Sequence, residues 1–166
     1  MAPPPPPLSP AFHGDGHDHE SCVETALDRA VRLCGERGTR LTDMRRDVLE
    51  LVWRGHEPIG AYDLLDALRT KHPGAAPPTV YRALDFLIGQ GLVHRIESLN
   101  AYVGCNRPEH SHASQFLICE SCGATAELND PAIEAAVQRR AAALGFEVGR
   151  QTIEARGLCP RCREAG

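Results

Sequence analysis

Two pairs of cysteines in the second half of the chain constrain its fold more than any other feature. The first pair is Cys119 and Cys122, the second is Cys159 and Cys162, and both have the spacing Cys-x-x-Cys. Each pair places two sulfur atoms on one tight turn, so the two pairs together can supply a tetrahedral zinc site. Because four thiolates leave no position for water or substrate, the pattern predicts a structural zinc ion that holds two distant segments together.

A redox-active pair and two disulfides are the alternative interpretations of these thiols. No apolar run in the sequence approaches the roughly 20 residues that span a bilayer. The N-terminus, MAPPPPPLSP, lacks the basic and apolar segments of a secretory signal. We therefore expect a cytoplasmic protein, in which the 7 cysteines are more often reduced ligands than disulfides.

A second group of candidate metal ligands lies between the two halves of the chain and consists of His94, Cys105, His112 and Glu127. One thiolate, two imidazoles and one carboxylate form a complete tetrahedral set for Zn²⁺, and the thiolate disfavours magnesium and manganese. Such a mixed set can bind more weakly than four thiolates and must release protons, which suits reversible occupancy. Sequence spacing alone also allows the simpler interpretation that these side chains are solvated.

Residues 1–22 are predicted to form a disordered tail, because a proline run is followed by the polar stretch HGDGHDHESC. His13, His17, His19 and Cys22 could bind metal transiently. Since a tail cannot hold a fixed coordination geometry, we expect no specific site there.

Residues 23–104 show the pattern of four helices followed by a hairpin. Apolar residues recur at helical spacing in 23–37, between Asp43 and Gly55, in 60–71 and from Pro77 onward. Thr42 suits an N-cap, and Pro77 suits a first helical turn. Two strands, 92–96 and 101–104, then flank a turn at 98–100. This order is typical of a winged helix-turn-helix, whose recognition helix lies in the major groove of DNA; a helical bundle with an added hairpin is the alternative.

The overall charge does not reveal a DNA-binding protein. The formal net charge is −4, which taken globally argues against nucleic acid as a partner. If the chain binds DNA, its basic residues must gather on one face.

Residues 105–166 are predicted to form a small α/β unit. Strands are expected at 115–120 and 124–128, and an interrupted strand over 146–155. Between them a helix is expected to start with Asp130 as its cap and Pro131 at its first position. We expect the helix to face inward with Ile133, Val137, Ala141 and Leu144. Because so small a unit cannot bury much apolar surface, it should pair with a second copy and be stapled by metal. The predicted fold class is α+β, with an N-terminal winged helix-turn-helix followed by this dimerisation unit.

Four sequence motifs resemble the ferric uptake regulator family and, more narrowly, its zinc uptake regulator branch. They are PPTVYRALDFLIGQGLVHRIES, AYVGC, HASQFLICESCG and CPRC, in that order, and the resemblance covers about residues 23–162. It implies a winged-helix DNA-binding domain at 23–104 and an α/β dimerisation and metal-binding domain at 105–166. It also implies a homodimer, not an enzyme, that binds double-stranded operator DNA and represses zinc uptake genes when regulatory zinc is bound.

The resemblance also implies two zinc ions per subunit and a role for individual residues. The structural zinc ligands would be Cys119, Cys122, Cys159 and Cys162, and the regulatory zinc ligands would be His94, Cys105, His112 and Glu127. Tyr62 and Arg82 match base-contacting positions, and Thr79 and Tyr81 match positions near the phosphates. An arginine on a recognition helix can donate two hydrogen bonds to one guanine, which makes this role chemically reasonable.

Three alternatives differ in the chemistry of the second metal group. Iron-sensing members of the family carry a His-His-Asp-His run before the first thiol pair, whereas this chain has His110-Ser111-His112, so an iron or peroxide sensor is disfavoured. A thiol redox switch is a second possibility. A metalloenzyme is the third, although catalytic zinc usually keeps one position open for water and four protein donors are predicted here. His110 has no assigned role.

Overall fold

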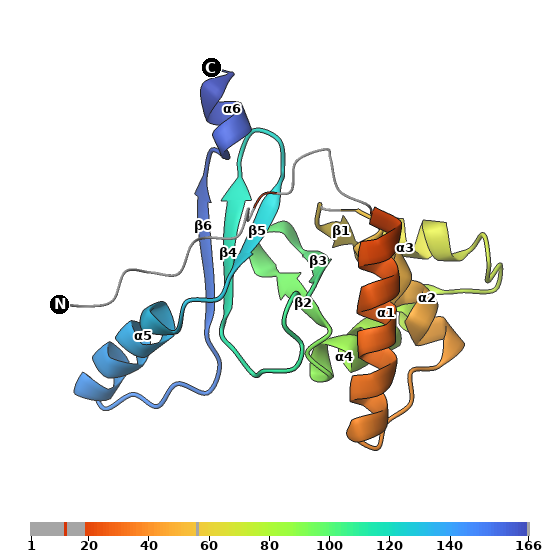
Figure 1. Ribbon diagram of the computed structural model, residues 1–166, viewed down its shortest axis with the longest axis horizontal. Helices are drawn as coiled ribbons and strands as arrows, with labels where there is room; N and C mark the ends of the chain where they lie inside the picture. The colour runs from red at the N-terminus through yellow and green to blue at the C-terminus, as the bar shows by residue number, and fades with distance from the viewer. Residues whose placement is uncertain (1–11, 13–18, 56, 166) are drawn as a thin grey trace.

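The computed structural model describes residues 12, 19–55 and 57–165 (Figure 1). The segment predicted to be a tail lies mostly outside these described residues, including His13 and His17. In the part of the chain that is described, no helix is both long and apolar enough to cross a membrane.

Four helices form the N-terminal unit and share one apolar core. They are α1 (His19–Glu36), α2 (Asp43–Trp53), α3 (Ala61–Leu68) and α4 (Pro77–Gly89). The predicted N-cap is confirmed, because the Thr42 hydroxyl accepts from the backbone N–H of Arg45. Leucines from each helix are almost fully buried, and the core includes Leu27, Leu49, Leu64, Leu68, Val80, Leu84 and Leu87. This burial fixes the exposed face that α4 presents to solvent.

The wing follows α4 as an antiparallel hairpin. Strands β2 (Val93–Ile96) and β3 (Ala101–Gly104) are joined by a 3₁₀ turn, η1 (Glu97–Leu99), and the short strand β1 (Ile59–Gly60) pairs with the other edge of β3. Strand β1 was not predicted. Gly104 must be glycine, because a Cβ there would lie 2.2 Å from Cε2 of Trp53. The wing is thereby packed closely against α2.

A second sheet builds the C-terminal unit. Its strands are β4 (Ser114–Cys119), β5 (Thr125–Leu128) and β6 (Thr152–Gly157), in the order β5-β4-β6. Strand β4 pairs antiparallel with β5 and parallel with β6. Helix α5 (Pro131–Ala143) begins at the predicted cap Asp130, and α6 (Pro160–Glu164), which was not predicted, carries the last thiol. Among the residues that the structure describes, one edge of β5 and one edge of β6 have no partner strand.

Several predicted details are wrong. Helix α1 begins at His19 rather than at residue 23, α3 ends at Leu68 rather than at residue 71, and β6 begins at Thr152 rather than at residue 146. Val31, one of the apolar residues that recur at helical spacing in 23–37, has 49% of its surface exposed rather than facing the core. The prediction that α5 faces inward is also wrong for the single chain. No residue of α5 is buried, and Leu144, just beyond its end, is 86% exposed. Figure 1 shows the cause: α5 projects beside the end of the sheet instead of covering it.

A small apolar cluster joins the two units. Ile96 of the wing is fully buried against Phe116 and Ile118 of β4, and Val103 of β3 packs on the same cluster. Wing and sheet therefore lie side by side, as Figure 1 shows for β2, β3 and β4. This contact places the end of the wing next to the group of candidate ligands.

Candidate metal centres and nucleic-acid interface

The structure brings the four paired cysteines together at one end of the second sheet. Their sulfur atoms all lie within 4.8 Å of one another, and the sulfurs of Cys122 and Cys159 are 3.8 Å apart. Four sulfurs at about 2.3 Å from one zinc ion would be about 3.8 Å apart, so the spacing fits. The backbone N–H of Cys159 donates to the sulfur of Cys119 at 3.4 Å and is the main reason why the pKa of that thiol is lowered to about 6.

The second predicted group also converges, although its members come from four separate segments. His94 lies on β2, Cys105 directly follows β3, His112 precedes β4 and Glu127 lies on β5. One donor atom from each lies within 4.8 Å of the others. Nε2 of His112 is 3.7 Å from the sulfur of Cys105 and 2.8 Å from Oε1 of Glu127. Donors around one tetrahedral zinc ion are about 3.3–3.8 Å apart, so a small outward adjustment would accommodate the ion.

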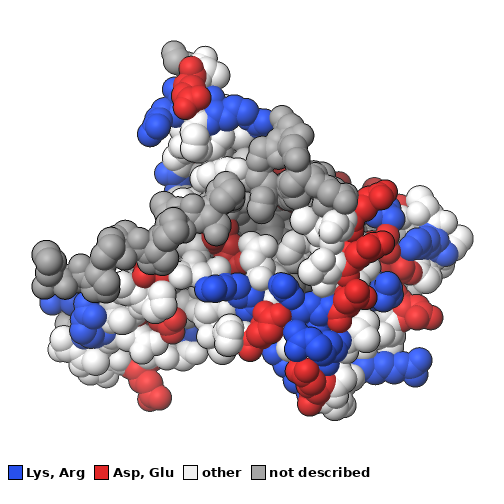
Figure 2. All heavy atoms as spheres, in the orientation of Figure 1, with Lys and Arg blue, Asp and Glu red and all other residues white. Residues whose placement is uncertain are grey.

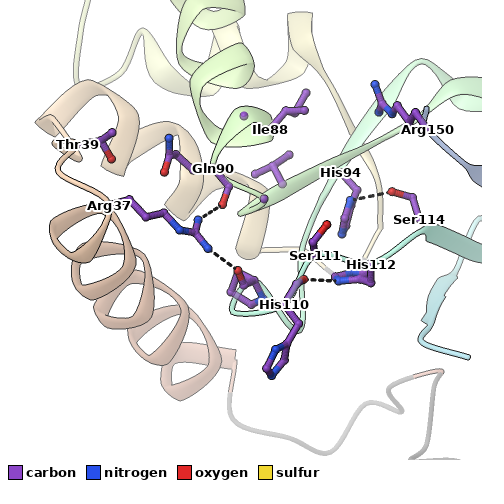
Figure 3. A pocket seen from close by; sticks show the side chains of 14 residues that line it. Arg37, Thr39, Ile88, Gln90, His94, His110, Ser111, His112, Ser114 and Arg150 are labelled. Atoms are coloured by element: carbon purple, nitrogen blue, oxygen red, sulfur yellow. Dashed lines mark hydrogen bonds between the residues drawn. The ribbon is translucent and has the colours of Figure 1, made fainter. Parts of the chain in front are cut away.

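Hydrogen bonds orient both imidazoles of this group (Figure 3). Nδ1 of His94 lies 3.1 Å from the hydroxyl of Ser114, and Nδ1 of His112 donates to the carbonyl of His110 at 2.8 Å. Both Nε2 atoms are then left to face Glu127. His94 Nε2 is buried and has no hydrogen bond of acceptable geometry, although it lies 3.0 Å from the carboxylate. A buried nitrogen without a hydrogen bond, fixed through its other ring nitrogen, is what a metal ligand requires.

The protonation states of Cys105 and Glu127 suit the binding of a cation. Burial, with the nearby carboxylate of Glu127, raises the pKa of the Cys105 thiol to about 12. Burial would also raise the pKa of Glu127, but contacts from His94 and the N–H of Asn106 outweigh it and lower that pKa. The site thus holds an ionised carboxylate beside a neutral thiol whose proton a metal ion can replace. The donor set fits zinc.

The outer contacts of the site include residues that the sequence interpretation missed. Arg29 of α1 donates to the carbonyl of Asn106 at 3.2 Å and pairs with Glu109 at 3.0 Å, while Arg37 donates to the carbonyl of Pro108 at 3.0 Å. These contacts attach the segment between Cys105 and His112 to α1 and to Arg37, which directly follows it. No sequence signal marks them, because arginines on the outer face of a helix are normally solvated.

A cavity of about 550 Å³ opens beside the imidazoles, between the ends of α1 and α4 and the segment before β4. Its lining includes Arg37, Gln90, His94 and His112 (Figure 3). His110 also lines it, but its side chain is exposed and is not part of either donor group. The cavity gives solvent access to the second donor group.

The predicted DNA-contacting residues lie on the outer surface of the helical unit. Tyr81 and Arg82 project from α4, and Tyr62 of α3 is 70% exposed. Within the described chain, Arg82 makes no hydrogen bond or ion pair, so its guanidinium is available to a partner. Thr79 is half-buried in the first turn of α4.

No single-sign patch covers the face of the molecule seen in Figure 2, where basic and acidic side chains intermingle over the helical half. The case for DNA binding therefore depends on the presentation of α4 and not on net charge. The chain lacks an obvious electrostatic footprint in this view, in agreement with its formal charge of −4.

A sequence model of the Ferric uptake regulator family matches residues 36–156. A curated relative, the Zinc uptake regulation protein of Escherichia coli strain K12, is 44% identical over 146 residues, which cover 87% of this chain and 85% of that protein. Among solved structures, "Zinc Uptake Regulator Complexed With Zinc AND DNA" has a TM-score of 0.83 at 44% identity and covers 86% of this chain and 96% of that chain.

A third relative has been solved in two forms that differ in their likeness to this chain. The holo form of XcZur has a TM-score of 0.79 at 45% identity, covering 84% of this chain and 98% of that chain. The apo form has a TM-score of 0.50 at 42% identity, covering 86% and 99%. The arrangement of the two units described here is therefore similar to the holo and DNA-complexed forms.

Proposed function

The chain belongs to the ferric uptake regulator family, and we propose that it is a zinc-responsive transcriptional repressor. It would bind operator DNA as a homodimer when its regulatory zinc ion is bound, and so control zinc uptake genes. One observation carries the proposal: a four-donor group fit for zinc is shared between the wing and the second unit. The likeness to a zinc uptake regulator in complex with zinc and DNA supports it.

We assign two zinc ions to each subunit, with different roles. Four thiolates, from Cys119, Cys122, Cys159 and Cys162, form a closed structural site, which ties β4 to α6. His94, Cys105, His112 and Glu127 form the regulatory site. The regulatory set contains only one thiolate, and that thiol must first lose its proton, so its zinc would exchange more readily than the structural zinc.

The regulatory site would control the angle between wing and sheet. A bound zinc ion would supply a fixed tetrahedral link among its four donors. His94 would then hold the end of α4 and the wing against Glu127 and His112, which belong to the second unit. In a dimer this fixes the separation and tilt of the two α4 helices, so that they match half-sites about one helical turn, roughly 34–36 Å, apart. When His94 is released, the fraction of competent dimers falls and the apparent affinity falls with it.

The exposed face of α4 is the proposed reading surface. Arg82 would pair with a guanine, Tyr62 would contact a base from α3, and Thr79 and Tyr81 would lie near phosphates.

The second unit is the proposed dimerisation surface. Val137, Leu144, Phe146 and Leu158 are between 38% and 86% exposed, an unusual share of large apolar residues for so small a unit. One edge of β6 pairs with no strand of the described part of the chain, and a second copy could extend the sheet there. We therefore keep the boundary at residues 104 and 105, with a DNA-binding domain before it that starts at α1 and a dimerisation domain after it.

The alternatives account less well for the same residues. An iron or peroxide sensor would need more oxygen and nitrogen donors, and the exposed His110 supplies none to the group. An enzyme would keep a metal position open for water, whereas all four positions have a protein donor here. As a repressor, the protein would act in the cytoplasm, the compartment expected from its sequence.

A metal comparison tests the proposal. The full-length dimer, with its structural zinc in place, is titrated with buffered zinc, iron(II) or manganese(II) against a duplex selected from a random library by the zinc-loaded protein. Zinc should promote binding at the lowest free concentration. A dimer that selects no duplex, or that responds better to iron or manganese, would contradict the proposed function.

A further inference from the structure

A second contact between the two units contains no metal-binding group. The carboxylate of Glu154, on β6, accepts hydrogen bonds from the backbone N–H of Glu97 at 2.7 Å and of Ser98 at 3.1 Å. These two N–H groups belong to η1, the turn at the tip of the wing. Glu154, which belongs to the C-terminal unit, therefore binds the tip of the wing, which belongs to the N-terminal unit.

The turn needs such an acceptor. The first N–H groups of any helical turn lack partners within the turn, and η1 has Ile96 at its N-cap, which offers no side-chain cap. Glu154 fills this role from a strand that is distant in sequence. Since burial of the carboxylate is outweighed by hydrogen bonds from Ser98 and Glu97, the pKa of Glu154 is lowered and the group is ionised at neutral pH. Hydrogen bonds to an ionised acceptor are stronger than neutral ones.

The neighbouring charges do not compete for this carboxylate. The side chain of Glu97 points to Arg95, with 3.4 Å between Nε and Oε2, and Arg95 also donates to Asn100 at 2.9 Å. Arg156, on the same strand as Glu154, favours its ionised form. Glu154 thus faces the backbone of the turn.

Apolar packing next to this contact adds to its effect. Ile96 precedes η1 and is fully buried against Phe116, and Phe116 is the register partner of Glu154 across β4 and β6. The wing therefore contacts the sheet through two adjacent sets of residues, one apolar and one polar. The apolar set adjoins the regulatory site, because the Phe116 ring meets the His94 ring edge-on with 5.6 Å between their centroids. The polar contact of Glu154 with η1 includes no ligand of that site.

We propose that Glu154 is a positioning residue that latches the wing to the dimerisation unit and thereby sets the zinc concentration at which the protein switches. This inference rests on the proposed zinc-responsive function. The hydrogen bonds of Glu154 favour the closed arrangement, in which the wing lies against the second sheet, before zinc fills the regulatory site. Less of the binding free energy of zinc is then needed to bring the wing and the sheet together. Without the latch, the same closed state forms, but only at higher free zinc.

The test compares Glu154→Ala and Glu154→Gln with Glu147→Ala. Glu147 is an exposed acid of the same unit with no hydrogen bond or ion pair within the described chain, so its variant controls for the charge change. The free-zinc midpoint of DNA binding should rise roughly tenfold for Glu154→Ala, as expected for hydrogen bonds to a charged group. Glu154→Gln keeps a neutral acceptor and should shift the midpoint by roughly threefold. At saturating zinc all three variants should bind DNA within about twofold of wild type.

Amide exchange supplies an independent measurement at the contact. In the dimer with structural zinc only, the N–H groups of Glu97 and Ser98 should exchange faster in Glu154→Ala than in wild type or Glu147→Ala. If Glu154→Ala does not form a folded dimer, the Glu154→Gln midpoint decides. Unchanged midpoints for the folded Glu154 variants, with wild type still zinc-responsive, would overturn the latch alone. A wild-type protein whose DNA binding ignores zinc would overturn the proposed function instead.

Discussion

Nε2 of His94, on the wing, lies 3.0 Å from Oε1 of Glu127, on the second sheet. The two residues belong to different units, so any ligand that binds both must also fix the units relative to each other. Both side chains are largely buried, with 12% and 3% of their surfaces exposed, so an approaching ion meets them with little competing water. This shared position would be the physical basis of the proposed switch, in which zinc binding controls DNA binding.

Replacing His94 with alanine should separate zinc sensing from folding. His94→Ala removes the only donor from the wing, so DNA binding should no longer respond to zinc, while a folded dimer with one zinc ion per subunit should remain. Metal content, sedimentation and a DNA-binding titration measure these properties.

His110→Ala is the matched control, because His110 lines the same cavity but belongs to neither donor group. It should keep a wild-type response. A His94→Ala protein that still binds DNA only in zinc would refute the assignment of His94.

Cys159→Ser should damage the second unit and not the first. Its sulfur lies 3.8 Å from that of Cys122 and its N–H supports Cys119, so its loss leaves an incomplete structural site. Zinc content should fall by about one ion per subunit and the dimer should dissociate. Cys22→Ser, on α1 and outside both groups, should change neither property. A stable Cys159→Ser dimer that lacks this zinc would show that the site is not structural.

Arg82→Ala should weaken DNA binding without changing zinc binding. An arginine that pairs with guanine contributes about 1–3 kcal/mol of discrimination, so the affinity at saturating zinc should fall roughly 5- to 150-fold. Zinc affinity measured without DNA should stay at the wild-type value. Arg139→Ala, on the exposed surface of α5, is the control and should bind DNA normally. Equal DNA affinities for the two variants would exclude Arg82 as a base contact.

Zinc binding at the regulatory site should release a proton from Cys105. Burial raises the pKa of this thiol to about 12, so it is protonated throughout the neutral range and must ionise to bind the metal. Zinc affinity should therefore increase with pH, by roughly tenfold per unit for this one proton. Calorimetry in buffers of different ionisation enthalpy counts the released protons. Cys105→Ser, which has no thiol, should lose both this proton and most of the affinity; an affinity independent of pH would contradict the account.

The sequence predicted the parts of the structure that local chemistry determines. The cap at Thr42, the proline start of α4 and the cap at Asp130 are signals within a few residues, and all three are found where expected. Both ligand groups also converge; the first is marked in the sequence by its two Cys-x-x-Cys pairs, and the second by the family resemblance. The predicted inward face of α5 was wrong because no other described segment of the chain covers its apolar residues.

The contacts between units could not be predicted from the sequence. Strand β1 has only two residues and depends on the edge of β3. The hydrogen bonds that Glu154 accepts from η1, and the one that Arg29 donates to Asn106, join segments that come together only after both units have folded. A glutamate on an edge strand and an arginine on a helix are ordinary surface residues in a sequence, so nothing distinguishes them before the fold is known.

The most direct test of the account measures DNA affinity of one dimer at two zinc loadings. Native mass spectrometry first establishes a dimer with one zinc ion per subunit, held by the four thiolates, and a dimer with two per subunit. The dissociation constant for the selected duplex is then measured for each at the same salt concentration. The account predicts that the second ion tightens binding by at least roughly tenfold, a typical coupling between sites. Equal affinities for the two dimers would contradict it.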